Sequence, residues 1–89
     1  MDAGDDPLVR ELRDRISELD RTLFRIVNER LELVARLKEH KDEQGYEFVD
    51  PRRERHMVEE QVAASSGRLS ADGLRRFYAE LLALTKREL

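Results

Sequence analysis

The sequence predicts an all-α protein: a three-helix chain, with one very long helix and two shorter ones, that forms an intertwined helical homodimer. Leucine, arginine and glutamate, which favour helices, dominate residues 7–41, and this stretch has no glycine and no proline after Pro7. Asp50-Pro51 and Ser70 mark two further helix starts, because Asp and Ser are preferred N-caps and proline suits the first helical position. We expect residues 1–6 to form a disordered or frayed tail and residues 7–89 to form one helical domain.

The long helix has one apolar face. Apolar side chains recur in it at intervals of three and four residues, which is typical of an amphipathic helix, at Leu8, Leu12, Ile16, Leu19, Leu23, Val27, Val34 and Leu37. Arg30 fills the gap in this apolar stripe, and Lys41 continues it. Burial of an unpaired charge costs several kcal/mol, so we expect these two cations to meet an anion.

Capping residues predict the remaining boundaries. Asp5 or Asp6 is expected to cap the long helix, which should end near Asp42, and Gly45 should open the following loop. The second helix should stop around Ser65-Ser66-Gly67. Val49 is expected to anchor the loop before it to the core.

The length of the first helix favours a dimer. A helix of about 35 residues is ~52 Å long, whereas a compact globule of this chain length is roughly 31 Å across. The two shorter helices could cover only part of its apolar stripe, so another chain is needed. An ordinary antiparallel coiled-coil dimer is the alternative that geometry leaves open.

Composition excludes several classes of function. The formal net charge of -3 argues against a general nucleic-acid binder, and no apolar run approaches the ~20 residues that span a bilayer. The chain has no cysteine, which excludes disulfides and thiolate metal sites and is compatible with a reducing cytoplasm. His40 and His56 are isolated, so we expect no metal and no other cofactor. The acidic N-terminus does not resemble a signal peptide.

Further charged or polar residues lie near the predicted apolar faces of all three helices, at Arg13, Arg53, Glu54, Thr85 and Glu88. These residues, and Arg30 and Lys41 with them, have ordinary structural explanations. An arginine can snorkel at the edge of a stripe, Lys41 can complement a helix dipole, and Arg53 and Glu54 can belong to a solvated face. Thr85 can pack as a small residue between helices, and Glu88 can be an exposed terminal charge. Taken together, several cations and a carboxylate in a helical interior indicate a preorganised pocket for a small polyanion, because arginine binds carboxylates bidentately.

The types, order and spacing of these residues resemble those of the all-helical (type II) chorismate mutases. The matching segments are Leu12-Arg13-x-x-Ile16-x-x-Leu19-Asp20, Asn28-Glu29-Arg30, Lys38-x-x-Lys41 and Val49-Asp50-Pro51-x-Arg53-Glu54-Arg55. They keep the spacing of the family without a gap from Leu12 to Glu54. The resemblance implies an interlocked dimer of three-helix chains, in agreement with the length argument.

The resemblance also implies the roles of individual residues. Arg13 from the partner chain and Arg30 would bind the two carboxylates of chorismate, and Lys41 would reach the ether oxygen of the breaking bond. Arg53 would shape the site, while Glu54 and the Asp50 backbone would hold the ring hydroxyl. Thr85 matches a small hydroxyl residue that contacts a carboxylate.

The end of the third helix departs from the family. Four residues after Thr85 the family usually has Gln or Glu, which assists the lysine at the ether oxygen, and here that position is Leu89. Either Glu88 takes this role or the site lacks the donor. A glutamate donates a hydrogen bond only when it is protonated, so the first case predicts activity that falls as pH rises.

We therefore interpret the chain as a cofactor-free, homodimeric, cytoplasmic chorismate mutase of aromatic amino acid biosynthesis. It would bind neither nucleic acid nor membranes, and activation by a larger partner enzyme is left open. A 4-amino-4-deoxychorismate mutase and an isochorismate-pyruvate lyase are the alternatives on the same fold. A non-catalytic helical dimerisation or regulatory module is the alternative from another class.

Overall fold

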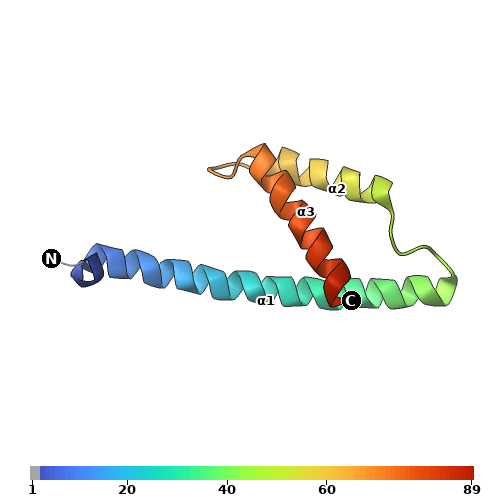
Figure 1. Ribbon diagram of the computed structural model, residues 1–89, viewed down its shortest axis with the longest axis horizontal. Helices are drawn as coiled ribbons and strands as arrows, with labels where there is room; N and C mark the ends of the chain where they lie inside the picture. The colour runs from blue at the N-terminus through green and yellow to red at the C-terminus, as the bar shows by residue number, and fades with distance from the viewer. Residues whose placement is uncertain (1–2) are drawn as a thin grey trace. The chain divides into compact units, whose positions relative to one another are not determined.

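The computed structural model describes residues 3–89, which form helices and no strands (Figure 1). A 3-10 turn at Ala3–Asp5 precedes three α-helices: α1 (Pro7–Gln44), α2 (Pro51–Ala64) and α3 (Ala71–Glu88). The predicted all-α class, with one very long and two shorter helices, is confirmed. Of the predicted tail, residues 1 and 2 lie outside the described part of the chain.

Two compact units make up the chain, Met1–Leu33 and Val34–Leu89, and the boundary between them falls within α1. The described part of the first unit consists of the 3-10 turn and the greater part of α1. The second unit contains the last turns of α1, both shorter helices and the loops between them.

Side-chain and backbone caps fix the two ends of α1. Asp6 Oδ1 accepts hydrogen bonds from Leu8 N at 2.9 Å and Val9 N at 3.5 Å, so Asp6 satisfies two of the unpaired N–H groups of the first turn. The helix ends at Gln44, two residues beyond the predicted end near Asp42. It continues because glutamate and glutamine favour helix, and it stops where Gly45 adopts a φ of 74°, a left-handed conformation that costs glycine little.

From Leu8 to Leu23 the apolar stripe of the first unit is exposed. Leu8 is 58% exposed, Ile16 57% and Leu19 69%, and none of the residues of α1 is buried. A single helix has no second apolar surface against which to bury its stripe, so its side chains remain in water unless another surface covers them.

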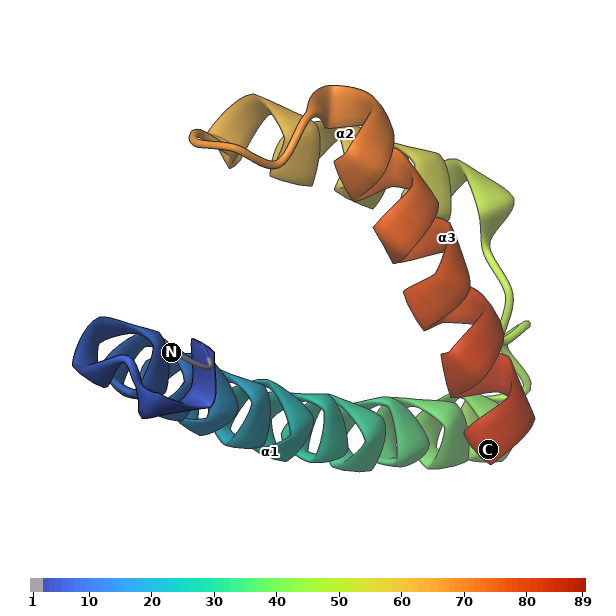
Figure 2. The same cartoon turned by 60° about the vertical axis from the view of Figure 1, so that its left-hand side comes forward.

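In the second unit, α2 and α3 pack against each other (Figure 2). Asp50 caps α2, and α2 ends at Ala64, as the Ser65-Ser66-Gly67 signal predicts. Ser70 caps α3 through a hydrogen bond of 2.9 Å from Gly73 N to Ser70 Oγ. Both predicted N-caps are therefore confirmed, and Tyr78 and Thr85 of α3 are buried.

We predict that Ser70→Ala lowers the free energy of unfolding by about 1 kcal/mol, because the amide of Gly73 loses its acceptor. For a chain of this size the loss corresponds to a fall of roughly 4–8 °C in Tm, measured by circular dichroism. Ser70→Asp, which keeps an oxygen acceptor at the N-cap, should stay close to wild type. Equal melting of the alanine and aspartate variants would show that the cap does not stabilise α3.

Candidate active site

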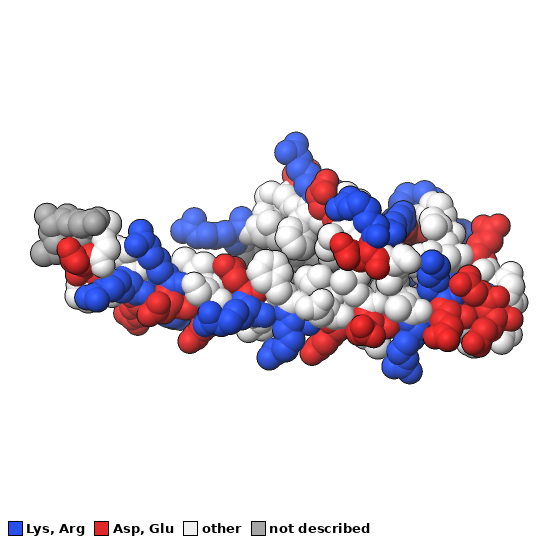
Figure 3. All heavy atoms as spheres, turned by 60° about the horizontal axis from the view of Figure 1, so that its bottom comes forward, with Lys and Arg blue, Asp and Glu red and all other residues white. Residues whose placement is uncertain are grey.

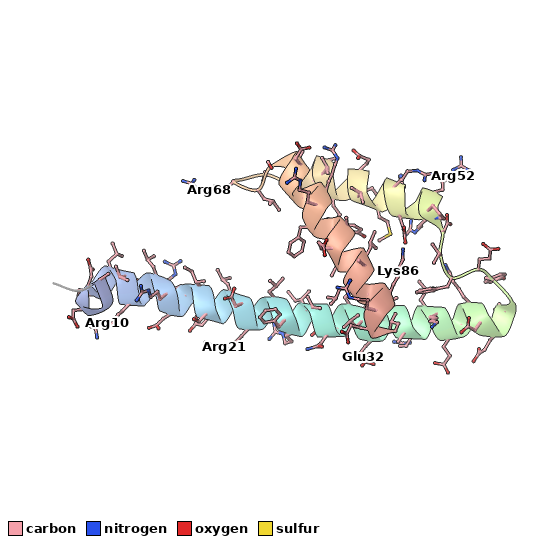
Figure 4. The ribbon with its side chains drawn as sticks, viewed as in Figure 1. Arg10, Arg21, Glu32, Arg52, Arg68 and Lys86 are labelled. Atoms are coloured by element: carbon pink, nitrogen blue, oxygen red, sulfur yellow. The ribbon has the colours of Figure 1, made fainter. Side chains whose placement is uncertain are left out.

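Two of the predicted site residues lie on α1 within the first unit. Arg13 is exposed, as are its neighbours from residue 10 to residue 25. Arg30 is half-buried, as expected for a cation that occupies a position of the apolar stripe. The side chains of this helix are drawn in Figure 4.

Lys41 lies in the second unit, in the last turn of α1, and is half-buried. Its ammonium donates a hydrogen bond of 3.3 Å to the backbone carbonyl of Phe48. Among the residues that the structure describes, no carboxylate lies within ion-pair distance of Lys41. A neutral carbonyl orients the ammonium without cancelling its charge, so Lys41 keeps its capacity to bind an anion.

The loop that supplies this carbonyl has two further contacts with α1. Tyr46 N donates to Lys41 O at 2.8 Å, and Lys38 Nζ lies 5.8 Å from the centre of the Phe48 ring. Phe48 is half-buried, whereas Val49 is 44% exposed. Phe48 therefore anchors the loop in place of Val49, because its ring can lie against a lysine at a distance that suits a cation–π contact.

The cap of α2 positions the next two site residues. Asp50 Oδ1 accepts a hydrogen bond of 3.2 Å from Arg53 N, and Glu54 N donates to Asp50 O at 3.0 Å. These two bonds fix the backbone of the first turn, from which the Arg53 and Glu54 side chains project. Arg53 is exposed, and the Glu54 side chain is only 29% exposed.

Glu54 is paired with a residue that sequence reasoning missed. Lys86 Nζ lies 3.3 Å from Glu54 Oε1, and this ion pair joins the first turn of α2 to the last turn of α3. Figure 4 labels Lys86 near the C-terminal end of α3. No sequence pattern signals this pairing, because a lysine in the last turn is already explained by the helix dipole.

Thr85, which precedes Lys86 in the chain, is only 5% exposed. Its hydroxyl donates a hydrogen bond of 2.7 Å to Leu81 O, one turn back along α3. To donate to a substrate carboxylate this hydroxyl must rotate away from Leu81. Glu88 is exposed at the end of α3 and Leu89 is 37% exposed at its C-cap, so whether Glu88 or Leu89 takes the position after Thr85 stays a hypothesis.

A second ion pair joins α2 and α3 outside the predicted site. The guanidinium of Arg75 meets both carboxylate oxygens of Glu59 at 3.3 Å, in the bidentate arrangement typical of arginine. The hydrogen bond and charge of Glu59 raise the pKa of Arg75 above its ordinary value, and Asp72 adds a smaller contribution. Arg75 is exposed, so this pair is screened by solvent.

Both signs of charge occur on the face of the molecule that Figure 3 draws. On this face, Lys and Arg side chains are interspersed with Asp and Glu over most of the chain, and Asp and Glu side chains gather at the right-hand end of the view. Within residues 3–89 no group of three or more His, Cys, Asp or Glu side chains is placed to hold a metal ion. In the same part of the chain no helix has the length and apolar character needed to cross a membrane.

Within the second unit the structure brings Glu54 to Lys86 and Lys41 to the Phe48 carbonyl, and it does not pair Lys41 with Glu54. Asp50 serves as a cap, and Arg53 projects into solvent beside it. Local contacts therefore hold two half-buried groups of opposite charge, Lys41 and Glu54, and the buried hydroxyl of Thr85. Such a set can bind a polar anion and contains no paired nucleophile and base.

The chain is an all-helical protein whose candidate site holds charged groups suited to binding and positioning a small molecule. The family model of the type II chorismate mutases matches residues 12–88, and the chain belongs to this family. The chain is thus an isomerase, a chorismate mutase. The matched range includes every predicted site residue except Leu89.

A solved structure agrees with this assignment. Chorismate mutase (form I) from Thermus thermophilus superposes with a TM-score of 0.84 at 25% sequence identity, over 86% of this chain and 96% of that chain. No curated protein matches the chain at a significant level.

We predict that Phe48→Ala loosens the loop that holds Lys41, with a local loss of about 1 kcal/mol from the cation–π contact and the apolar area. Faster hydrogen exchange of the amides of residues 46–50, followed by NMR, would measure the effect. Val49→Ala is the matched control and should leave exchange near wild type. If the valine variant loosened the loop as much as the phenylalanine variant, Phe48 would not be the anchor.

Proposed function

We propose that the protein isomerises chorismate to prephenate by a concerted [3,3] rearrangement, in a pocket whose cations hold the substrate as its reactive diaxial conformer. The observation that carries this proposal is Lys41, a half-buried cation oriented by the Phe48 carbonyl and unpaired with any carboxylate of the described chain. Such a group is suited to an oxygen on which negative charge grows.

The chemistry needs no nucleophile, metal or general base. One C–O bond breaks and one C–C bond forms within the same molecule, so the protein contributes positioning and electrostatic stabilisation. Lys41 would stabilise the ether oxygen, and a contact of this kind is worth ~3 kcal/mol of barrier. Arg30 and the partner's copy of Arg13 would bind the two carboxylates.

The rigid first turn of α2 supports the other assignments. Glu54, half-buried and fixed by the Asp50 cap, would accept a hydrogen bond from the ring hydroxyl, and Arg53 would border the pocket. Thr85 would contact a carboxylate after its hydroxyl leaves Leu81. The 4-amino-4-deoxychorismate reaction is the second candidate, because Leu89 stands where the family usually has a polar donor.

We predict that Arg30→Ala lowers kcat/KM for chorismate by about 100-fold or more while the chain stays folded. Loss of chorismate absorbance gives the rate, and mass spectrometry identifies prephenate. Arg25→Ala is the control, since Arg25 is an exposed arginine of the same helix. The amino analogue and isochorismate are assayed in parallel. Turnover of only one of these two compounds would make that compound the substrate. Turnover of none of the three compounds would contradict the proposal.

We further propose that the active protein is an intertwined homodimer, because the apolar stripe of the first unit is exposed from Leu8 to Leu23 in the single chain. A second copy of the same helix supplies a matching apolar surface. The dimer would place Arg13 in the site of its partner. The cytoplasm is the compartment that we propose, since the cysteine-free composition suits a reducing environment.

We predict that mixing Arg13→Ala and Arg30→Ala chains restores activity. If Arg13 serves the partner's site, each mixed dimer holds one intact site, and random exchange of subunits gives roughly a quarter of wild-type activity. The mixture is unfolded and refolded together, and its rate is compared with those of the two separate variants. If both arginines served the site of their own chain, the mixture would remain as inactive as its components.

A further inference from the structure

We propose that Lys86 is a positioning residue that sets substrate specificity: by pairing with Glu54, it makes the site select a neutral hydroxyl over a charged amino group on the substrate ring. This inference rests on the proposed function of Glu54. It adds a residue that the sequence pattern did not place in the site.

Lys86 and Glu54 form an ion pair between α3 and α2. Lys86 Nζ and Glu54 Oε1 are 3.3 Å apart, and among the described residues each is the other's ion-pair partner. The Glu54 side chain is 29% exposed and the Lys86 side chain 46%, so Glu54 lies on the more buried side of the contact. Lys86 also follows Thr85, the most buried residue of α3, which fixes the start of its side chain.

The ammonium of Lys86 changes what the Glu54 carboxylate offers to a ligand. An ionised carboxylate that is alone in a half-buried site attracts a cation strongly, whereas a carboxylate with an ammonium 3.3 Å away has little net charge to offer. The paired carboxylate still has free lone pairs, so it can accept a hydrogen bond from a hydroxyl. Glu54 beside Lys86 is thus a hydrogen-bond acceptor and a poor cation receptor.

The two substrates differ in the charge of the ring substituent that Glu54 would contact. Chorismate presents a neutral hydroxyl, and its 4-amino analogue presents an aliphatic amine that is protonated at neutral pH. The ammonium of the analogue would give up its hydration and meet the like charge of Lys86. The same ion pair that holds Glu54 toward a hydroxyl therefore disfavours the amino substrate.

The test compares kcat/KM for both substrates in wild type, Lys86→Met and Lys86→Arg. We expect Lys86→Met to raise the ratio of kcat/KM for the amino analogue to kcat/KM for chorismate by at least about fivefold. Lys86→Arg should leave this ratio at the wild-type value because it keeps the charge. Arg75→Met is the matched control, since it removes the other ion pair between α2 and α3. It should leave the ratio unchanged even if it lowers Tm.

Three results would count against the inference. An unchanged ratio of the two kcat/KM values in folded Lys86→Met would overturn it. An equal shift of this ratio in Arg75→Met would also overturn it, because it would point to a general loosening of the contact between α2 and α3. Lys86→Gln, which keeps the polarity and much of the length of the side chain, replaces the methionine variant if that variant does not fold. Wild-type protein inactive on both substrates would contradict the proposed function, and this inference with it.

Discussion

The structure depends on how a charged side chain is kept where an apolar one is expected. Lys41 falls on the apolar stripe of α1, and the loop after the helix returns to place the Phe48 carbonyl 3.3 Å from its ammonium. The carbonyl replaces part of the hydration that half-burial removes, without adding an opposing charge. A carboxylate in the same place would stabilise the lysine more strongly and would compete with an anionic substrate.

At the start of α2, too, one residue holds the backbone in place while its neighbours are the ones that would contact the substrate. Asp50 uses its carboxylate to accept a hydrogen bond from the amide of Arg53, so it fixes the helix start through the backbone and engages neither the Arg53 nor the Glu54 side chain. Glu54 then meets Lys86 from the far end of α3, and this contact ties the termini of two helices to one point. Groups that would touch the substrate are thus held by neighbours that would not, as positional accuracy in an active site requires.

Much of this could be predicted from the sequence, because it depends on local rules. The helix class, the Asp50 and Ser70 caps and the anomalous positions of Arg30 and Lys41 follow from periodicity and capping preferences, which act over a few residues. The Lys86–Glu54 pair and the anchoring of the loop by Phe48 depend on where distant segments meet. Both anchor candidates, Phe48 and its neighbour Val49, are apolar, so composition alone could not choose between them.

Gly45 has a consequence for the tolerance of the enzyme to mutation. Its φ of 74° suits glycine, and a Cβ built there would meet nothing within 4 Å. An alanine would therefore fit sterically and still carry a conformational cost of about 1 kcal/mol. That cost would fall on the loop that orients Lys41. Variation at position 45 should thus be restricted by backbone conformation alone, at a residue whose own atoms need never touch the substrate.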